Sequence, residues 1–358
     1  MSVERVGIVL PDLGGGGVQR VLVNLAQGMV ERGVDVRICT LEERPVKLAL
    51  PPGVAHHALG GRNPLASIGA LQRIVASERI DALVGGITRA NLAALAAARG
   101  KVRTLLTKHL PVDMLSCSAL RRIGLRTLIR NAYARADAVV AVSVGTYESL
   151  LTTGLPAARV HRIANPVLGD DVAARSAASI DEPWLVGVGP PVIVAAGRLV
   201  PQKDFATLLR AFALVRAHVE ARLIVLGEGP ERVALERLAT SHGITTDVRF
   251  RGHVSDVMPY FANAAAVVAT SRWEGLPTTI IEALAAGASV VSTDCRTGPR
   301  EILRDGALGA LVPVGDAEAV AGAVLDALDR PHPIAASALD RYRIPTAAAA
   351  YMRLLEAL

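Results

Sequence analysis

The chain has 358 residues, a formal net charge of +6 and 51% hydrophobic residues, but only 3% of its residues are aromatic. This length suits two domains of ordinary size. No run of 18 apolar residues is present, which disfavours a membrane-spanning helix. The shortage of aromatic side chains that stack on bases disfavours nucleic acid as a partner. Three widely spaced cysteines without metal-ligand spacing predict a reduced, cytoplasmic protein.

Short runs rich in Val, Ile and Leu alternate with helical patterns along the chain, which predicts parallel sheets covered by helices on both faces. In the first half the predicted strands are 4–11, 34–40, 80–86, 102–107, 136–143 and 159–165. In the second half they are 191–197, 221–227, 247–252, 265–270 and 288–293. Prolines and glycines interrupt the pattern between the two series. We therefore predict an α/β fold with two doubly wound domains, 1–168 and 191–340, a linker at 169–190 and a helical segment at 341–358.

Ligands of open parallel sheets bind beyond the carboxyl ends of the strands, so the residues that follow each strand are candidate site residues. The first such loop contains four glycines, Gly14 to Gly17, ahead of a helix predicted to begin near Val18. Bare backbone at a helix N-terminus lets an anion or a sugar approach closely. The loop is neither a dinucleotide-binding fingerprint nor a P-loop, and a flexible turn is the alternative interpretation.

The loop after strand 191–197 carries two cations, Arg198 and Lys203, at the start of a predicted helix. Cations are unfavourable at the positive end of a helix dipole, although Asp204 can offset part of the cost by capping. The arrangement is favourable if an anion binds there, because Arg supplies a bidentate fork and Lys a point charge that suit a diphosphate. Two solvated surface cations are the alternative.

Two carboxylates, Glu274 and Glu282, stand in the otherwise apolar stretch 270–293. Pro277 starts a predicted helix there, and Thr278 and Glu282 share one of its faces. Glu282 lies too far into the helix to cap it, so vicinal hydroxyls such as those of a ribose would suit its carboxylate. Glu274 precedes the helix and would contact a second sugar or take part in chemistry. An internal salt bridge with helix-start stabilisation is the structural alternative.

Positive charge is concentrated between Arg99 and Arg135, where nine Lys or Arg residues stand with one acid, Asp113. Such a cluster could face a membrane surface, nucleic acid or an anionic substrate. Within it, the segment 120–137 mixes arginines with Leu and Ile. It is therefore either a basic amphipathic helix at the inner face of the cell membrane or an internal helix with solvated arginines.

The spacing E-x7-E from Glu274 to Glu282, with EGLP between, resembles the retaining GT-B glycosyltransferases of the large fourth family, and so does G-R-L-x(3)-K from Gly197 to Lys203. The resemblance covers nearly the whole chain. It implies two Rossmann-like domains that face each other across a cleft, with the C-terminal helix, 341–358, crossing back to the first. It also implies a nucleotide-sugar donor held mainly by the second domain.

The resemblance implies a role for each matching position. Arg198 and Lys203 would hold the diphosphate, Glu282 the ribose and Glu274 the donor hexose. His109, in TKHLP, would lie near the reacting sugar, although a core or surface histidine is an equal alternative. The remaining donor-site residues would act mainly through their backbone; they are Gly16, Gly17, Gly197, Gly252, His253, Gly275, Leu276, Pro277 and Thr278.

The segment Cys295–Glu301 resembles the subgroup that builds bacterial surface glycans. Its members move galactose or an N-acetylhexosamine from UDP to a lipid-linked or polysaccharide acceptor. Arg296-Thr297 departs from the Pro-Ser that is frequent there, so the donor stays open. Positive potential from Arg198, Lys203 and helix N-termini makes a metal or other cofactor unnecessary. The rival functions are a UDP-sugar epimerase, a phosphorylase and a non-catalytic sugar-nucleotide sensor.

Overall fold

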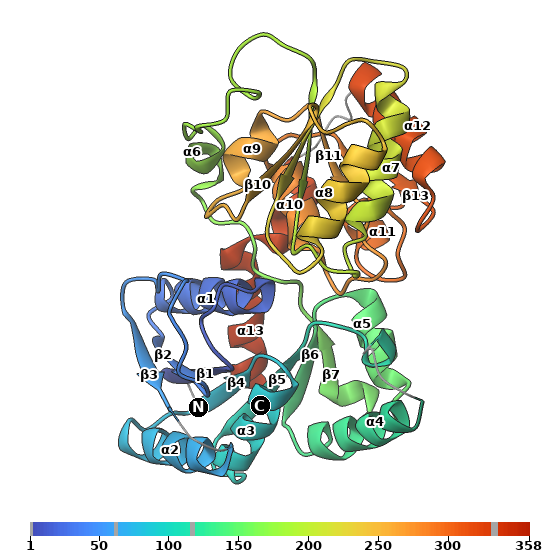
Figure 1. Ribbon diagram of the computed structural model, residues 1–358. Coiled ribbons are helices and arrows are strands. Elements are labelled where there is room, and N and C mark those ends of the chain that lie inside the picture. The colour runs from blue at the N-terminus through green and yellow to red at the C-terminus, as the bar shows by residue number, and fades with distance from the viewer. Residues whose placement is uncertain (1–2, 61–63, 115–118, 331–335) are drawn as a thin grey trace. The chain divides into compact units, whose positions relative to one another are not determined.

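The computed structural model describes residues 3–60, 64–114, 119–330 and 336–358. The chain divides into two compact units, each built on one parallel β-sheet with helices on both faces (Figure 1). Unit 1 comprises Met1–Val167 and Arg341–Leu358, and unit 2 comprises Leu168–Asp340. The prediction of an α/β fold with two doubly wound sheets is confirmed.

The described residues of unit 1 form a seven-stranded sheet in the order β3-β2-β1-β4-β5-β6-β7, in which all pairs are parallel. The reversal of strand order after β1 is the doubly wound pattern, in which crossover helices cover first one face and then the other. Its strands are β1 (Arg5–Leu10), β2 (Asp35–Thr40), β3 (Val54–Ala58), β4 (Ala82–Gly85), β5 (Arg103–Lys108), β6 (Ala138–Ala141) and β7 (Val160–Arg162).

Helices α1 and α13 cover one face of this sheet, and their apolar residues share a core with alternate residues of the central strands. Gly28 lies where the two helices meet: a Cβ at this position would stand 2.7 Å from Ala348 Cβ, so only glycine allows the close approach. Helices α2 to α5 pack on the other face. The helices of unit 1 are α1 (Gly17–Val30), α2 (Pro64–Ser77), α3 (Thr88–Ala98), α4 (Ala119–Tyr133), α5 (Val144–Leu151) and α13 (Ile344–Ala357), with 3-10 turns at Val112–Met114 and Ala157–Arg159.

Unit 2 has a six-stranded parallel sheet, within the described residues, in the order β10-β9-β8-β11-β12-β13. Helices α7, α8 and α12 share one apolar core with it, and α9 and α10 contact each other. The strands are β8 (Val192–Ala196), β9 (Arg222–Leu226), β10 (Val248–Gly252), β11 (Ala266–Ala269), β12 (Val290–Thr293) and β13 (Ala310–Val312). The helices are α6 (Val172–Ser176), α7 (Phe205–Arg216), α8 (Arg232–Ser241), α9 (Met258–Ala262), α10 (Thr278–Ala285), α11 (Pro299–Ile302) and α12 (Ala317–Asp329), with a 3-10 segment at Ala336–Tyr342.

The segment predicted as a linker, 169–190, falls within unit 2. Arg175 donates two 2.8 Å hydrogen bonds to Asp256, and buried Glu182 pairs with Arg249. The Arg249 guanidinium also lies 4.2 Å from the ring centroid of Trp184, a cation–π contact. These contacts connect residues more than 60 positions apart, so the sequence offers no local pattern for them. The C-terminal segment, in contrast, belongs to unit 1, where α13 packs on α1.

Candidate functional site

The loop after β8 leads into the N-terminus of α7, which is capped by Asp204. Asp204 has a left-handed backbone (φ 46°), and its carboxylate accepts hydrogen bonds from the Thr207 backbone N–H (3.4 Å) and hydroxyl (2.9 Å). It also accepts a 3.0 Å bond from Arg272 Nε. The expected capping role is therefore present, and it fixes Lys203 immediately before the helix.

Lys203 and Glu274, which were predicted to bind a diphosphate and a hexose, contact each other directly. The Lys203 ammonium donates to Glu274 Oε1, which also accepts a 2.7 Å bond from the Ser271 hydroxyl. The Thr297 hydroxyl donates to the main-chain oxygen of Glu274. Glu274 is only 7% exposed, and a buried charge needs a compensating partner. Lys203 provides it through an internal salt bridge. This is the arrangement that the structural alternative for Glu274 described.

Arg198, in contrast, is exposed, and its guanidinium forms no ion pair or side-chain hydrogen bond with any residue that the structure describes. Its loop is tightly supported by the loop after β9: a Cβ on Gly227 (φ 131°) would lie 1.9 Å from the carbonyl oxygen of Gly197. Only glycine permits this close contact between the two loops. Glu228, which follows Gly227, forms an exposed i,i+4 ion pair with Arg232 of α8.

Glu282 lies on α10, about one turn after the helix begins at Thr278, and is 7% exposed. Arg175 of α6 is close enough to Glu282 for the two charges to interact. The pKa of Arg175 is raised chiefly by its hydrogen bond to Asp256, and the negative charge of Glu282 adds to the increase. Arg175 was not predicted as a site residue, because it lies in the predicted linker and at no helical spacing from Glu282. An ionised carboxylate can accept hydrogen bonds from two neighbouring hydroxyls.

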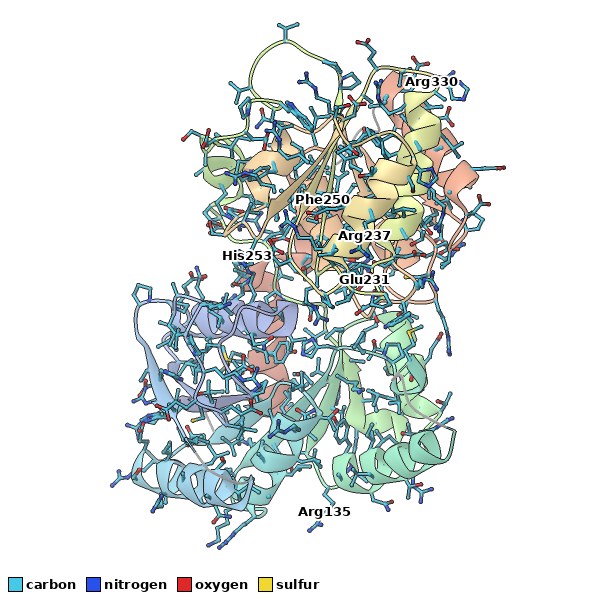
Figure 2. All side chains as sticks on the ribbon, viewed as in Figure 1. Arg135, Glu231, Arg237, Phe250, His253 and Arg330 are labelled. Atoms are coloured by element: carbon cyan, nitrogen blue, oxygen red, sulfur yellow. The ribbon has the colours of Figure 1, made fainter. Side chains whose placement is uncertain are left out.

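The remaining donor-site candidates of unit 2 lie at the same edge of the sheet. Gly252 ends β10 with a left-handed backbone (φ 83°), and its carbonyl accepts a 2.7 Å bond from Gly227 N–H. His253 follows it and is exposed; Figure 2 shows it beyond the end of β10, past Phe250. Gly275, Leu276 and Pro277 form the buried turn between β11 and α10, and Thr278 is the first residue of that helix. The loops after β8, β9, β10 and β11 thus form one continuous edge.

In unit 1, Gly16 is the N-cap of α1 and Gly17 its first residue, at the carboxyl end of β1. Gly17 is exposed, and a Cβ there would meet no atom within 4 Å. The Asp12 carboxylate accepts a 2.7 Å bond from the Gly14 N–H and holds the preceding turn. The α1 N-terminus has no side-chain cap. The bare backbone expected from the glycine run is therefore present.

His109 follows β5 and is 8% exposed. Its Nε2 lies 2.9 Å from Thr107 Oγ1, whose single hydrogen already bonds to the Gly85 carbonyl at 2.7 Å. Thr107 must therefore accept from Nε2–H, which assigns the neutral tautomer with a lone pair on Nδ1. Burial, with a smaller effect of the Lys108 charge, lowers the pKa of His109 to about 3. His109 is thus a neutral hydrogen-bonding group rather than a cation.

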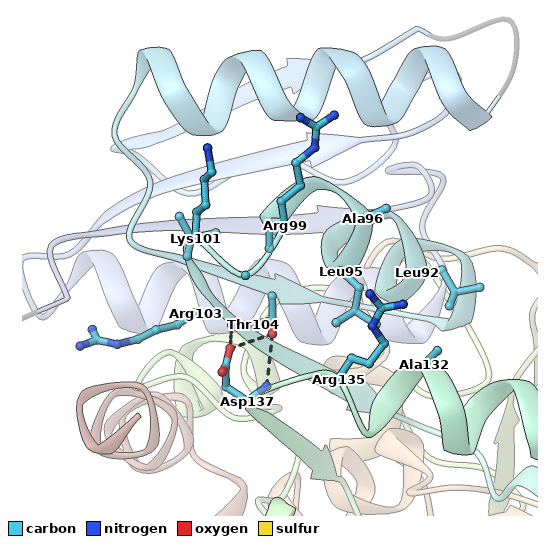
Figure 3. Close-up of a pocket in the computed structure, with 13 residues that line it drawn as sticks. Leu92, Leu95, Ala96, Arg99, Lys101, Arg103, Thr104, Ala132, Arg135 and Asp137 are labelled. Carbon is cyan, nitrogen blue, oxygen red and sulfur yellow. Dashed lines mark hydrogen bonds between the residues drawn. The ribbon is translucent and has the colours of Figure 1, made fainter.

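The basic cluster between Arg99 and Arg135 does not form one surface. Arg99, Lys101, Arg103 and Arg135 line a pocket of about 600 Å³ at the amino end of β5. Figure 3 shows this pocket, with Asp137 bonded to Thr104 and the arginines pointing in different directions. Lys108 lies at the opposite end of the same strand. Strand β5 therefore separates charges that are close in sequence.

In the segment 120–137, α4 ends at Tyr133, and the side chains of Arg121 and Arg122 lie outside the described residues. Arg126 donates a 2.8 Å bond to the Thr152 carbonyl, and Ile129 is buried.

None of the helices in the described ranges has both the length and the hydrophobicity needed to cross a bilayer.

Two family models match the two units. "Glycosyltransferase Family 4" matches residues 15–167, and "Glycosyl transferases group 1" matches residues 190–330, so that together they span most of the chain. The chain belongs to the family 4 glycosyltransferases. The resemblance drawn from the E-x7-E and G-R-L-x(3)-K residues is confirmed at the level of this family.

Individual relatives match either a part of this family 4 chain or nearly all of it. The lipopolysaccharide core biosynthesis glycosyltransferase LpsE of Rhizobium meliloti is 39% identical over 43% of each chain, so the match spans less than half of its length. The N-acetylgalactosaminyltransferase of Campylobacter jejuni that acts on N-acetylgalactosamine-N,N'-diacetylbacillosaminyl-diphospho-undecaprenol is 24% identical over 87% of this chain and 86% of its own.

Solved structures similar to this chain establish the fold. HepE of Anabaena, crystallised with UDP and glucose, superposes with a TM-score of 0.80 at 18% identity, and covers 99% of this chain and 100% of its own. The lipopolysaccharide outer core galactosyltransferase WaaB has a TM-score of 0.75 at 18% identity and covers 99% of each chain. The predicted GT-B fold class is confirmed.

Proposed function

We propose that this chain is a retaining, metal-independent glycosyltransferase. It transfers a hexose or an N-acetylhexosamine from a UDP-sugar to a glycan or lipid-linked acceptor during bacterial surface polysaccharide synthesis. It acts in the cytoplasm, with peripheral contact to the inner face of the membrane. The observation that carries this proposal is the edge of unit 2 where Arg198, Lys203 and the buried Glu282 follow neighbouring strands.

The chemistry of this edge fits a nucleoside diphosphate. Exposed Arg198 and the N-terminus of α7 offer positive potential to a diphosphate, and Glu282 offers a carboxylate to the ribose hydroxyls. Relatives add support, since HepE was crystallised with UDP and the Campylobacter enzyme acts on a diphosphate-linked lipid acceptor. The salt bridge between Lys203 and Glu274 is the resting arrangement, and the donor phosphate would compete with Glu274 for the ammonium.

In the transfer, the bond between the anomeric carbon and the phosphate oxygen breaks, and its electron pair leaves with UDP. The acceptor oxygen forms the new bond to the same carbon, and its proton passes to the departing phosphate or to water. Arg198, Lys203 and the α7 N-terminus would stabilise the charge that develops on UDP, which is the role a metal ion fills in other enzymes. Neutral His109 would accept a hydrogen bond from a sugar hydroxyl through Nδ1.

The decisive experiment is a UDP-release assay over a panel of nucleotide sugars, with and without glycan acceptors and with EDTA. We expect acceptor-dependent UDP release that EDTA does not abolish, and a product with the anomeric configuration of the donor by NMR. Conversion of the UDP-sugar without acceptor would indicate the epimerase instead. Binding without release under all conditions would indicate the sensor.

Two charge-matched pairs of variants test the assigned roles. Arg198→Ala should abolish turnover, whereas Arg237→Ala, an exposed cation of α8, should leave it unchanged. Glu282→Gln should weaken UDP binding roughly 10- to 100-fold, the effect of losing hydrogen bonds to a charged group. Glu220→Gln, at an exposed position of the same unit, serves as its control. Unchanged UDP affinity in Glu282→Gln would contradict the ribose assignment.

A further inference from the structure

The amino end of β5 holds a cationic pocket that the proposed function does not use. Its volume of about 600 Å³ is within the range of small-molecule sites. The C-terminal half of α3, the start of β5 and the residues around the end of α4 form its walls. Ligands of parallel sheets ordinarily bind at the carboxyl ends of the strands. This pocket therefore lies at the opposite edge of the unit 1 sheet from the glycine loop and His109.

Three of the cations that line the pocket have no counter-charge. Arg99, Lys101 and Arg135 are exposed, and none of their side chains forms an ion pair or a hydrogen bond within the described ranges. The one carboxylate among the lining residues, Asp137, forms no ion pair with them. It accepts bonds of 2.7 Å and 2.9 Å from the N–H and the hydroxyl of Thr104 instead. The three cations therefore keep their capacity to bind an anion.

The charge of the pocket as a whole is positive. Four cationic residues, of which Arg103 is the fourth, and one carboxylate line it, which gives a net charge of +3. The C-terminal ends of α3 and α4 each contribute about half a negative charge, which lowers the excess to about two positive charges. Complementation of the helix dipoles thus explains about one of the cations. The remaining charge matches a phosphate monoester, which carries about two negative charges at pH 7.

The pocket also has an apolar wall. Leu92 and Leu95 of α3 and Ala132 of α4 line it, and all three are half-buried (Figure 3). None of the large hydrophobic side chains that are exposed in the described part of unit 1 lines the pocket. The apolar surface is therefore recessed, and it suits the apolar portion of a small ligand better than it suits insertion into a bilayer.

We infer that this pocket is a second ligand site, which takes a soluble phosphate monoester with an apolar body. Arg99 and Arg135 would bind phosphoryl oxygens through their guanidinium groups, and Lys101 would add a point charge. The apolar body would pack on Leu92 and Leu95. Because the pocket belongs to unit 1 and the candidate donor edge to unit 2, this inference does not depend on the proposed function.

Calorimetric titration of the full chain with hexyl phosphate tests the site. Hexyl phosphate should bind at least about tenfold more tightly than inorganic phosphate, because part of its alkyl chain is buried on the leucines. Arg99→Gln and Arg135→Gln should each weaken its binding roughly 10- to 100-fold, the effect of losing hydrogen bonds to a charged group. Arg353→Gln, which replaces an exposed cation of α13 outside the pocket, should retain the wild-type affinity. Arg198→Ala should retain it too, whether or not this variant transfers a sugar.

Each of four results would overturn the inference. The first is equal affinity for hexyl phosphate and inorganic phosphate, and the second is unchanged affinity in both arginine variants of the pocket. The third is binding that Arg198→Ala loses while Arg99→Gln and Arg135→Gln keep it, since this would place the ligand at the donor edge. The fourth is flotation with phosphatidic acid vesicles that requires Arg99 and Arg135 in the absence of hexyl phosphate binding, which would make the pocket a membrane contact.

Discussion

Replacing Lys108 by methionine should make unit 1 more stable, and the gain should depend on pH. Methionine keeps most of the side-chain volume but removes the charge of a residue that is only 5% exposed and has no partner for its ammonium among the described residues. A substitution that removes an uncompensated buried charge removes its desolvation penalty. We therefore expect Lys108→Met to raise the free energy of unfolding at pH 7.

The pKa of Lys108 gives the magnitude. It falls from 10.5 in the unfolded chain to about 8 in the folded protein, a difference of about 2.5. At 1.36 kcal/mol for each pKa unit, this corresponds to about 3 kcal/mol at most. Below about pH 8 the lysine is charged in both states, so the wild type carries the full penalty. Between about pH 8 and 10.5 only the unfolded chain binds the proton, so wild-type stability rises toward that of the variant.

Urea unfolding at pH 7 to 10 measures this difference. Both tryptophans, Trp184 and Trp273, lie in unit 2, so a transition seen by circular dichroism but not by tryptophan fluorescence reports on unit 1. The advantage of Lys108→Met should be largest at pH 7 and should shrink by up to about 3 kcal/mol near pH 10.5. Lys101→Met, which removes an exposed charge, should show no such trend. The reasoning is refuted if Lys108→Met is no more stable than the wild type at pH 7 and if its stability changes with pH in the same way as that of the wild type.

Lys203→Met should lower the urea midpoint of the tryptophan-detected transition, because it leaves Glu274 buried without its cation, at a cost of roughly 3 kcal/mol. An unchanged midpoint would contradict the salt bridge. Gly28→Ala should destabilise unit 1 by about 1–3 kcal/mol, despite the better helix propensity of alanine, because α13 leaves no room for the methyl group. Gly322→Ala, in the interior of α12 with no neighbouring atom, should stabilise unit 2 by up to about 1 kcal/mol in the same urea assay. Asp204→Ala should cost about 2 kcal/mol through loss of the cap and through left-handed strain, whereas Asp204→Asn, which keeps both the acceptor and the αL tolerance, should cost less than half as much.

Local patterns in the sequence predicted most of the fold. All eleven predicted strands coincide with observed ones within a few residues, because buried parallel strands are short apolar runs bounded by turn residues. The strands that were not predicted are β3 and β13, one at the edge of each sheet. β3 is only partly buried and contains two histidines, and β13 has three residues, so neither carries a strong apolar signal.

The candidate site was located by the same rule, since its residues follow strands in the sequence. What the sequence did not predict is which of them contact each other. Lys203 and Glu274 are 71 positions apart and become partners because β8 and β11 are neighbours in the sheet. Arg175 approaches Glu282 because the supposed linker packs on α9.

The sequence by itself determined the strands, the helix starts and the loops that hold the candidate residues, because these depend on periodicity and turn chemistry over a few residues. Only the tertiary structure decided the charge environment of each group. Strand order placed Lys203 against a carboxylate and left Lys108 buried without one, and the length of β5 separated Lys108 from the other basic residues. Burial and pairing are long-range properties, since they depend on which distant segments pack against a side chain.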